Sequence, residues 1–129
     1  MDEHSFIRAV HSKLNTALRK WKIHDQFAGG VPDAYYLGPT SDLWIEYKYM
    51  KLLPIRPDTK LNTSFSELQR LWLDDLHRCG RPCALVIGHG RRAVVLQQGS
   101  WNSDITLDYF LKNSISRKEL IGWIEASCL

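Results

Sequence analysis

The chain has 129 residues, of which 44% are hydrophobic and 24% charged, a composition typical of one globular domain. The formal net charge of +3 suits a phosphate-rich partner but excludes no class of function. The 3 cysteines form no CxxC pair, so a disulfide framework and a zinc site are both disfavoured. The chain begins with acidic residues and has no apolar run long enough to cross a bilayer. We therefore expect a cytoplasmic protein, without a membrane partner, that forms one domain over residues 1–129.

The first half of the chain predicts one helix followed by strands. Apolar residues recur every three or four positions from Ser5 to about Trp21, which predicts an amphipathic helix. A short strand is expected at Ile23–Phe27, followed by a flexible turn at 28–30. Residues 34–37 and 43–49 are then expected to pair as antiparallel strands. The predicted order is thus helix, then strands.

The second half predicts another helix, two more strands and a helical C-terminus. The expected elements are a basic loop at 51–63, a helix starting after Ser64 or Ser66 and ending near Gly80, strands at 83–88 and 93–96, and helices at 104–111 and 116–126. Ser116 and Glu119 have the spacing of a capping box. The core is expected over about 5–97, with a C-terminal helical cover over about 104–127.

Three charged residues of the first half have the pattern of a metal-dependent hydrolytic site. Glu46 and Lys48 lie two positions apart on a predicted strand and therefore share one face. Antiparallel pairing would bring Asp33 close to Glu46. Two carboxylates and a backbone carbonyl suit Mg²⁺, and a nearby lysine can orient water and stabilise charge on a phosphodiester.

Each of these residues also has a purely structural interpretation. Asp33 follows Pro32 and could be a turn residue, while Glu46 and Lys48 could form a solvated ion pair. The apolar run that precedes Glu46 indicates a central strand, where an ionised carboxylate is costly unless it is paired or bound to metal. This context favours the functional interpretation.

Pro32-Asp33 and Glu46-Tyr47-Lys48 resemble the two motifs of the PD-(D/E)XK nuclease superfamily. Over residues 29–88 the chain also resembles the virus-type replication-repair nuclease (VRR-NUC) branch and the phage and archaeal Holliday junction resolvases. The resemblance implies a restriction-endonuclease-like α/β fold: an αβββαβ core with a mixed central sheet flanked by helices, plus C-terminal helices. It also implies an endodeoxyribonuclease that uses Mg²⁺ or Mn²⁺.

The same resemblance implies roles for individual residues. Asp33, Glu46 and the Tyr47 carbonyl would bind metal, Lys48 would be the catalytic lysine, and Gln69 would be a supporting polar residue. Many members add an acid from the first helix, which this chain does not place clearly. The candidates left open for that position are Glu3, His11 and Asn15.

Basic residues near the predicted site are candidates for DNA contacts. Lys51, Arg56 and Lys60 lie in the loop after the catalytic strand, and Arg70 lies on the next helix. Contacts to DNA phosphates require such residues, although ordinary solubilising charge has the same appearance. For the loop we favour the interpretation as a DNA-binding rim.

The small size of the chain, without a sequence-reading domain, favours recognition of branched DNA by analogy with resolvases. The alternatives are a flap or duplex nuclease of the same superfamily, or a non-catalytic nucleic-acid-binding module with a decayed nuclease fold. A phage origin would suit a resolvase. We expect a homodimer whose interface involves the first helix or C-terminal residues such as Trp123 and Ile124. Trp21, Trp44 and Trp72 are expected in the core.

Overall fold

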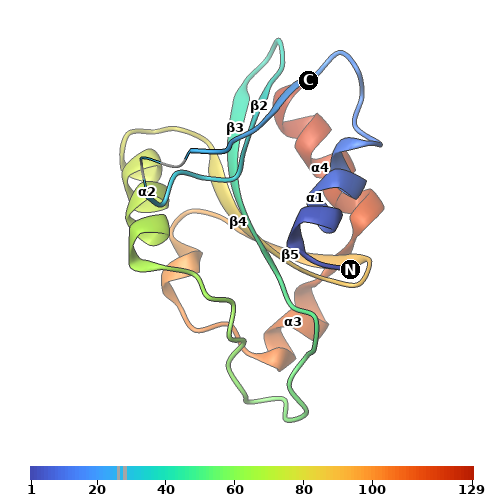
Figure 1. Cartoon of the computed structure of the whole chain (residues 1–129), viewed down its shortest axis with the longest axis vertical. Helices are drawn as coiled ribbons and strands as arrows, with labels where there is room; N and C mark the ends of the chain where they lie inside the picture. Colours follow the sequence, from blue (N-terminus) through green and yellow to red (C-terminus); the bar gives the residue numbers. More distant parts are fainter. Residues whose placement is uncertain (26, 28) are drawn as a thin grey trace.

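The computed structural model describes residues 1–25, 27 and 29–129 (Figure 1). Its elements in chain order are α1 (Glu3–His11), β1 (Arg19–Lys22), β2 (Ala34–Leu37), β3 (Asp42–Tyr49), α2 (Glu67–Arg78), β4 (Cys83–His89), β5 (Arg92–Leu96), the 3-10 helix η1 (Ser100–Asn102), α3 (Leu107–Asn113), β6 (Ile115–Ser116) and α4 (Arg117–Cys128). No helix of the described residues is both long and apolar enough to span a bilayer.

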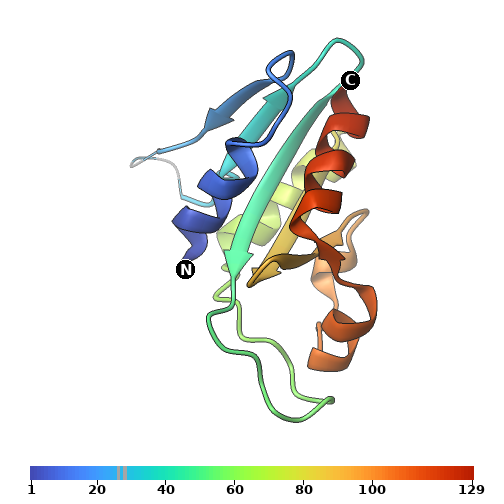
Figure 2. The same ribbon diagram turned by 90° about the vertical axis from the view of Figure 1, so that its right-hand side faces the viewer.

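The strands form one six-stranded sheet in the order β1-β2-β3-β4-β5-β6. β3 and β4 run parallel, joined by the α2 crossover, and the other neighbours pair antiparallel. α1 and α4 lie side by side on one face, and α2 lies on the other (Figure 2). The predicted mixed sheet flanked by helices, with its αβββαβ order, is confirmed.

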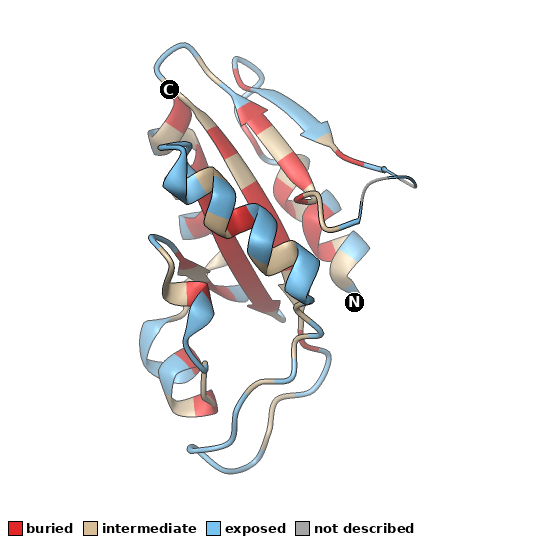
Figure 3. Ribbon diagram, turned by 90° about the vertical axis from the view of Figure 1, so that its left-hand side faces the viewer, coloured by how far each residue is buried: buried red, intermediate tan, exposed pale blue. Residues whose placement is uncertain are grey.

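Two apolar clusters fill the space on either side of the sheet. Leu43, Ile45 and Tyr47 of β3 pack with α1 and α4, whereas the partly buried Trp44 packs on the opposite side. β4 is buried on both faces over six successive residues, as its continuous apolar run predicts. β3 therefore lies in the middle of the sheet, and its Glu46 is buried in the interior (Figure 3).

The prediction that the first helix continues to Trp21 was wrong, because α1 ends at His11. The Asn15 side chain accepts a hydrogen bond from the Ala17 N–H, which forms a local turn that competes with the helix. Leu14 and Leu18 are nevertheless buried in the core. Their spacing of four matches a helix although the chain between them is not helical, and this coincidence produced the error.

The strand predicted at Ile23–Phe27 was also misplaced, since the first strand is β1 at Arg19–Lys22. Within that range Gln26 lies outside the described residues, as does Ala28 of the turn predicted at 28–30. The predicted starts of the helices in the second half of the chain are confirmed. Ser66 caps α2, and the capping box of Ser116 and Glu119 starts α4.

The predicted places for an interface and for the tryptophans need correction. Ile124 is fully buried in the core of its own chain and offers no free surface, whereas Trp123 is partly buried against the same cluster. Trp21 and Trp72 are 56% and 38% exposed instead of buried. Both indole rings therefore contribute to the exposed apolar surface.

Candidate active site

Asp33 lies directly before β2, where the register of the sheet brings it to β3. Ala34 pairs with Ile45, so Asp33 lies beside Glu46 at the start of the strand pair. The Tyr47 N–H donates a hydrogen bond of 2.9 Å to Asp33 Oδ2. The turn acid is thereby held against the strand segment that carries Glu46 and Lys48, as the predicted antiparallel pairing requires.

Glu46 is a buried carboxyl group without a compensating hydrogen bond. Its residue is 1% exposed, and among the described residues neither Oε1 nor Oε2 has a hydrogen-bond partner. Burial, followed by the charge of Asp33, raises the pKa of Glu46 to about 9. Lys48 Nζ lies 3.6 Å from Glu46 Oε2 and acts in the opposite direction, lowering that pKa. An arrangement this costly is typical of a functional site.

The start of α1 adds another acid to this group. Glu3 is partly buried, and burial together with the charge of Asp33 raises its pKa. Lys48 and Lys22 lower it, so Glu3 is within electrostatic reach of the same charged cluster. Lys22, which sequence reasoning missed, lies with Nζ 3.8 Å from Asp33 Oδ1. No motif singled out Lys22, because only the pairing of β1 with β2 brings it to Asp33.

The other two candidates for the acid position of the first helix have different partners. His11 Nε2 is hydrogen-bonded to the Tyr36 hydroxyl at 2.8 Å. Asn15 lies beyond the end of α1, and its N–H donates to Glu125 Oε2 at 2.7 Å. Of the three candidates, the structure brings only Glu3 into the charged cluster.

The donor set fits a hard cation that keeps part of its water shell. Among the described residues no group of three or more His, Cys, Asp or Glu side chains is arranged to hold a metal ion. Asp33 and Glu46 supply two carboxylates, and among the described residues the oxygens of Glu46 have no hydrogen-bond partner, so a cation would fit beside them. Mg²⁺ is commonly held by one or two carboxylates with several waters, so two acids suffice.

Gln69 has a structural contact in this chain. Its Oε1 accepts a hydrogen bond from the Ser66 N–H, and its own N–H donates to Ser66 Oγ, forming a capping box at the start of α2. The supporting role implied by the resemblance stays a prediction. The start of α2 nevertheless lies close to the loop that leads to Asp33, because Trp72 Nε1 donates to the Gly29 carbonyl at 3.2 Å.

Gly30 fixes the packing of this loop and was not identified as a site residue. Its φ is +85°, a region that favours glycine. A Cβ at this position would lie 2.6 Å from the Leu68 backbone. The Gly29-Gly30 pair in the sequence signals such a close approach, but only the folded chain identifies α2 as the partner.

The predicted DNA-binding residues are exposed or partly exposed, and two of them form ion pairs. Lys60 Nζ lies 2.9 Å from Asp104 Oδ2, and Arg70 pairs with Glu67 one turn earlier on α2. Lys51 is exposed two residues after β3. The pKa of Asp2 is lowered by its hydrogen bonds with Ser5, and the charge of Lys51 acts in the same direction. Arg56 is exposed in the loop between β3 and α2. Of the four predicted DNA-binding residues, Lys51 is the nearest in sequence to Glu46 and Lys48.

Comparison with known proteins adds evidence on the fold. No family model and no curated protein sequence matches the chain. Among solved structures, the chain is similar to Hjc from Archaeoglobus fulgidus, a Holliday junction resolvase from an archaeal hyperthermophile, with a TM-score of 0.58 and 14% sequence identity. The match covers 93% of this chain and 95% of that one. The chain therefore has the restriction-endonuclease-like fold of Hjc, as its sequence predicts.

Proposed function

We propose that the protein is a metal-dependent endonuclease that hydrolyses DNA phosphodiesters, with residues 1–129 forming one nuclease domain. The observation that carries this proposal is the buried Glu46 carboxyl group, which has no hydrogen-bond partner among the described residues and lies beside Asp33 and Lys48. Burial of such a group costs free energy. A cation bound to the Glu46 carboxylate would offset that cost, which explains why this carboxyl group is buried.

Each residue has a role that follows from its position. Asp33, Glu46 and the Tyr47 carbonyl would hold Mg²⁺ or Mn²⁺, and Glu3 would lie in an outer shell around them. When bound, the metal supplies positive charge that polarises the phosphate and acidifies water. Lys48, only 11% exposed in its side chain, orients the attacking water and stabilises negative charge on the phosphoryl oxygens.

Branched DNA is the substrate that we propose, with a homodimer as the acting form. The proposal is supported by the fold that the chain shares with Hjc, a Holliday junction resolvase. A junction has two equivalent strands to cut, and a two-fold dimer supplies two equivalent sites. Lys51, Arg56, Lys60 and Arg70 would contact phosphates beside the scissile strand, with Gln69 in support. We therefore propose a resolvase-like role, and we propose no preference for a DNA sequence.

The test is a cleavage assay on labelled four-way junction, flap, nicked, duplex and single-stranded DNA with Mg²⁺, Mn²⁺ or EDTA. The wild type should cut the junction symmetrically with either metal and leave it intact with EDTA. Glu46→Gln and Lys48→Met should bind the junction without cutting it. Asp108→Asn, which removes an acid on α3 that pairs with Lys112, is the matched control and should cut normally.

Three other outcomes would change the proposal. Cutting of flaps or duplex in preference to the junction would keep the nuclease and change its substrate. If the protein binds DNA but does not cut it with any metal, the protein is a nucleic-acid-binding module and not an enzyme. Equal activity of Glu46→Gln and the wild type would refute the site itself.

A further inference from the structure

Aromatic side chains form a row across three neighbouring strands of the sheet. Trp21 on β1 is paired with Tyr35 on β2, and Tyr35 is paired with Trp44 on β3. Residues that are paired across strands place their side chains on the same face, so the three rings share one face. Trp44 packs with the apolar cluster that contains Leu73 of α2, which identifies this face as the one on which α2 lies.

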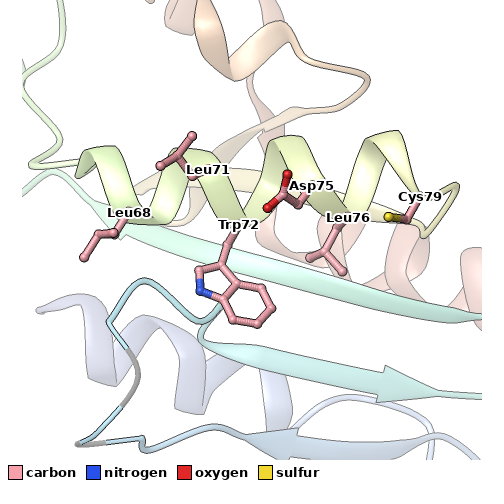
Figure 4. A pocket seen from close by; sticks show the side chains of 6 residues that line it. All are labelled: Leu68, Leu71, Trp72, Asp75, Leu76 and Cys79. Atoms are coloured by element: carbon pink, nitrogen blue, oxygen red, sulfur yellow. The ribbon is translucent and has the colours of Figure 1, made fainter.

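A cavity of about 420 Å³ lies over this row of rings, within the range of small-ligand pockets, which is roughly 300–1,000 Å³. Its lining includes the three tryptophans Trp21, Trp44 and Trp72. Trp72 reaches the cavity from α2, and Figure 4 shows its ring extending from the helix toward the strands. The cavity therefore has aromatic walls that come both from the sheet and from the helix beside it. We call it the tryptophan pocket.

Packing within the chain does not account for the Trp21 ring. The ring centroids of Tyr35 and Trp44 lie 4.5 Å apart, which is an ordinary cross-strand contact, and Trp72 donates its indole N–H to the Gly29 carbonyl. Trp21 is 56% exposed on the edge strand β1, which α2 does not cover (Figure 3). Its indole therefore offers open ring surface to the tryptophan pocket.

Polar groups in the lining suit a nucleotide. Lys22 supplies a positive charge, and His24 supplies a ring nitrogen for hydrogen bonding. The one acid of the lining, Asp25, accepts a hydrogen bond of 2.8 Å from the Phe27 N–H. Aromatic rings next to a cation are the usual means of binding a single strand of nucleic acid, because bases stack on the rings while phosphates meet the charge.

The tryptophan pocket adjoins the candidate active site on two sides. Trp44 lies two residues before Glu46 on β3, so their side chains share a face and their Cα atoms are about 7 Å apart. Lys22 Nζ lies 3.8 Å from Asp33 Oδ1. Val31, which also lines the pocket, lies two residues before Asp33. A base in the pocket therefore belongs to a nucleotide close to the phosphate that the site would cut.

We propose that the tryptophan pocket binds one unpaired nucleobase of the DNA strand that is cut. The base stacks on Trp21, with Trp44 and Trp72 as the walls, and Lys22 contacts the adjoining phosphate. A base inside a continuous duplex must first be unpaired and unstacked, which costs free energy, whereas a base at a branch point or in a single strand is already available. The inference rests on the proposed function, because it states which feature of branched DNA the nuclease recognises.

The first test measures the binding of a labelled oligothymidylate to the full chain by fluorescence anisotropy in EDTA, so that no strand is cut. Trp21→Ala should weaken binding by about 5- to 100-fold, the loss expected for one stacked base, and Trp21→Phe, which keeps a ring, should recover most of it. Tyr109→Ala is the matched control, because Tyr109 on α3 is 38% exposed and lies outside the pocket. Circular dichroism checks that each variant is folded. Equal binding by Trp21→Ala and the wild type, or equal losses in Trp21→Ala and Tyr109→Ala, would overturn the proposal.

The salt dependence of the same binding separates stacking from charge. Trp21→Ala should leave the slope of log K against log salt unchanged, because a ring contacts no phosphate. Lys22→Met should lower that slope by about 0.7, the value for one phosphate contact on a single strand. If Trp21→Ala lowers the slope as much as Lys22→Met does, the loss comes from disturbed phosphate contacts and the stacking role is wrong.

The second test changes the DNA and leaves the protein intact. A duplex with one extrahelical thymidine should bind the wild type more tightly than the same duplex with an abasic residue at that position. This advantage of thymidine should disappear in Trp21→Ala, because both changes remove the same contact and their effects are then not additive. An abasic residue that binds the wild type as well as thymidine does would refute the tryptophan pocket as a base site.

These measurements separate the tryptophan pocket from the nuclease activity, because both are made without cleavage. Base binding through Trp21 in a protein that cuts no DNA would refute the proposed function and support the pocket. Cleavage of a junction by a protein that does not distinguish thymidine from an abasic residue would refute the pocket and support the nuclease. If tryptophan emission without DNA shifts with protein concentration, and Trp21→Phe abolishes that shift, a second copy of the chain covers the pocket and the proposal is wrong.

Discussion

The Tyr47 backbone N–H donates a hydrogen bond to Asp33 Oδ2, so the acid that follows the turn is joined directly to β3. Tyr47 lies between Glu46 and Lys48, and its own ring points to the opposite face, where it packs in the core. The bond therefore sets the position of Asp33 relative to both neighbours. Two sequence motifs that lie 13 positions apart become one site through this contact.

Removal of either carboxylate should abolish stabilisation by metal. A ligand present at 100 times its Kd stabilises a protein by about 2.7 kcal/mol. Mn²⁺ should raise the free energy of unfolding of the wild type in this way, but not that of Asp33→Asn or Glu46→Gln. Without metal, Glu46→Gln should be as stable as the wild type or more stable at neutral pH, because burial raises the pKa of Glu46 to about 9 and folding must protonate this carboxyl group, a cost that glutamine does not have. Urea titrations with and without Mn²⁺ measure this.

The control for this titration is Asp108→Asn, which should respond to Mn²⁺ as the wild type does. An equal response in all the variants would mean that the metal binds elsewhere on the chain. Loss of folding in both site variants would instead assign Asp33 and Glu46 a structural role.

Glu3 is expected to contribute from an outer shell. Its pKa is raised by burial and by the charge of Asp33, and lowered by the charges of Lys48 and Lys22, which motivates this expectation. Loss of an outer-shell partner of a metal site typically costs about 10–100-fold in affinity or activity. Glu3→Gln should slow single-turnover cleavage by about that factor and leave stability nearly unchanged. Asn15→Ala, the other polar candidate, should leave the cleavage rate unchanged, and the reverse order of effects would contradict this assignment.

Gly30 should be irreplaceable while Gly80 should tolerate substitution. Both have positive φ, of +85° and +74°, so alanine strains either position by about 1–2 kcal/mol. A Cβ at Gly80 meets open space, whereas one at Gly30 collides with the Leu68 backbone. Gly30→Ala should therefore lower the free energy of unfolding by clearly more than Gly80→Ala in the same urea titration. It should also slow cleavage, since the loop leads to Asp33; equal effects of the two variants would argue against close packing here.

His11 should make the fold sensitive to acid. Burial, with a smaller effect of Lys20 and Lys22, lowers the pKa of His11 to about 4, while its ordinary value is 6.5. Between these values the unfolded chain binds a proton that the folded chain excludes. The contribution of His11 to the free energy of unfolding should be fully present above pH 6.5 and be lost as the pH drops toward about 4. The raised pKa of Glu46 acts in the opposite direction, so the variant is compared with the wild type at each pH. Relative to the wild type, His11→Gln, which can keep a hydrogen bond to Tyr36, should gain stability as the pH drops through this range.

Urea titrations at several pH values measure this effect, and His4→Gln is the control at an exposed position of the same helix. If the gain in stability at low pH, relative to the wild type, is absent in His11→Gln and present in His4→Gln, the assignment of this acid sensitivity to His11 is wrong.

The loop after β3 should supply part of the salt dependence of DNA binding. Each phosphate contact that is lost should reduce the slope of log K against log salt by about 1. The double variant Lys51→Ala, Arg56→Ala should lower that slope by about 2, measured by fluorescence anisotropy on a labelled junction. Lys112→Ala, on α3 and paired with Asp108, should leave it unchanged. Equal slopes for all three proteins would place the DNA contacts elsewhere.

Local patterns in the sequence determined most of the elements and the composition of the candidate site. The alternating pattern of β3, the apolar run of β4 and the serine caps of α2 and α4 each depend on a few neighbouring residues, so they are readable before folding. Asp33, Glu46 and Lys48 were identified in the same way, because the motifs and the strand period both point to them.

Contacts between distant segments were decided only by the tertiary structure. The placement of β1 and the approach of Lys22 and Glu3 to Asp33 depend on partners that are distant in the sequence. The same holds for the exposure of Trp72, which reflects how α2 lies over the sheet and not its own periodicity. A helical period shows which residues share a face, but only packing decides whether that face is covered, because burial is a property of the whole fold.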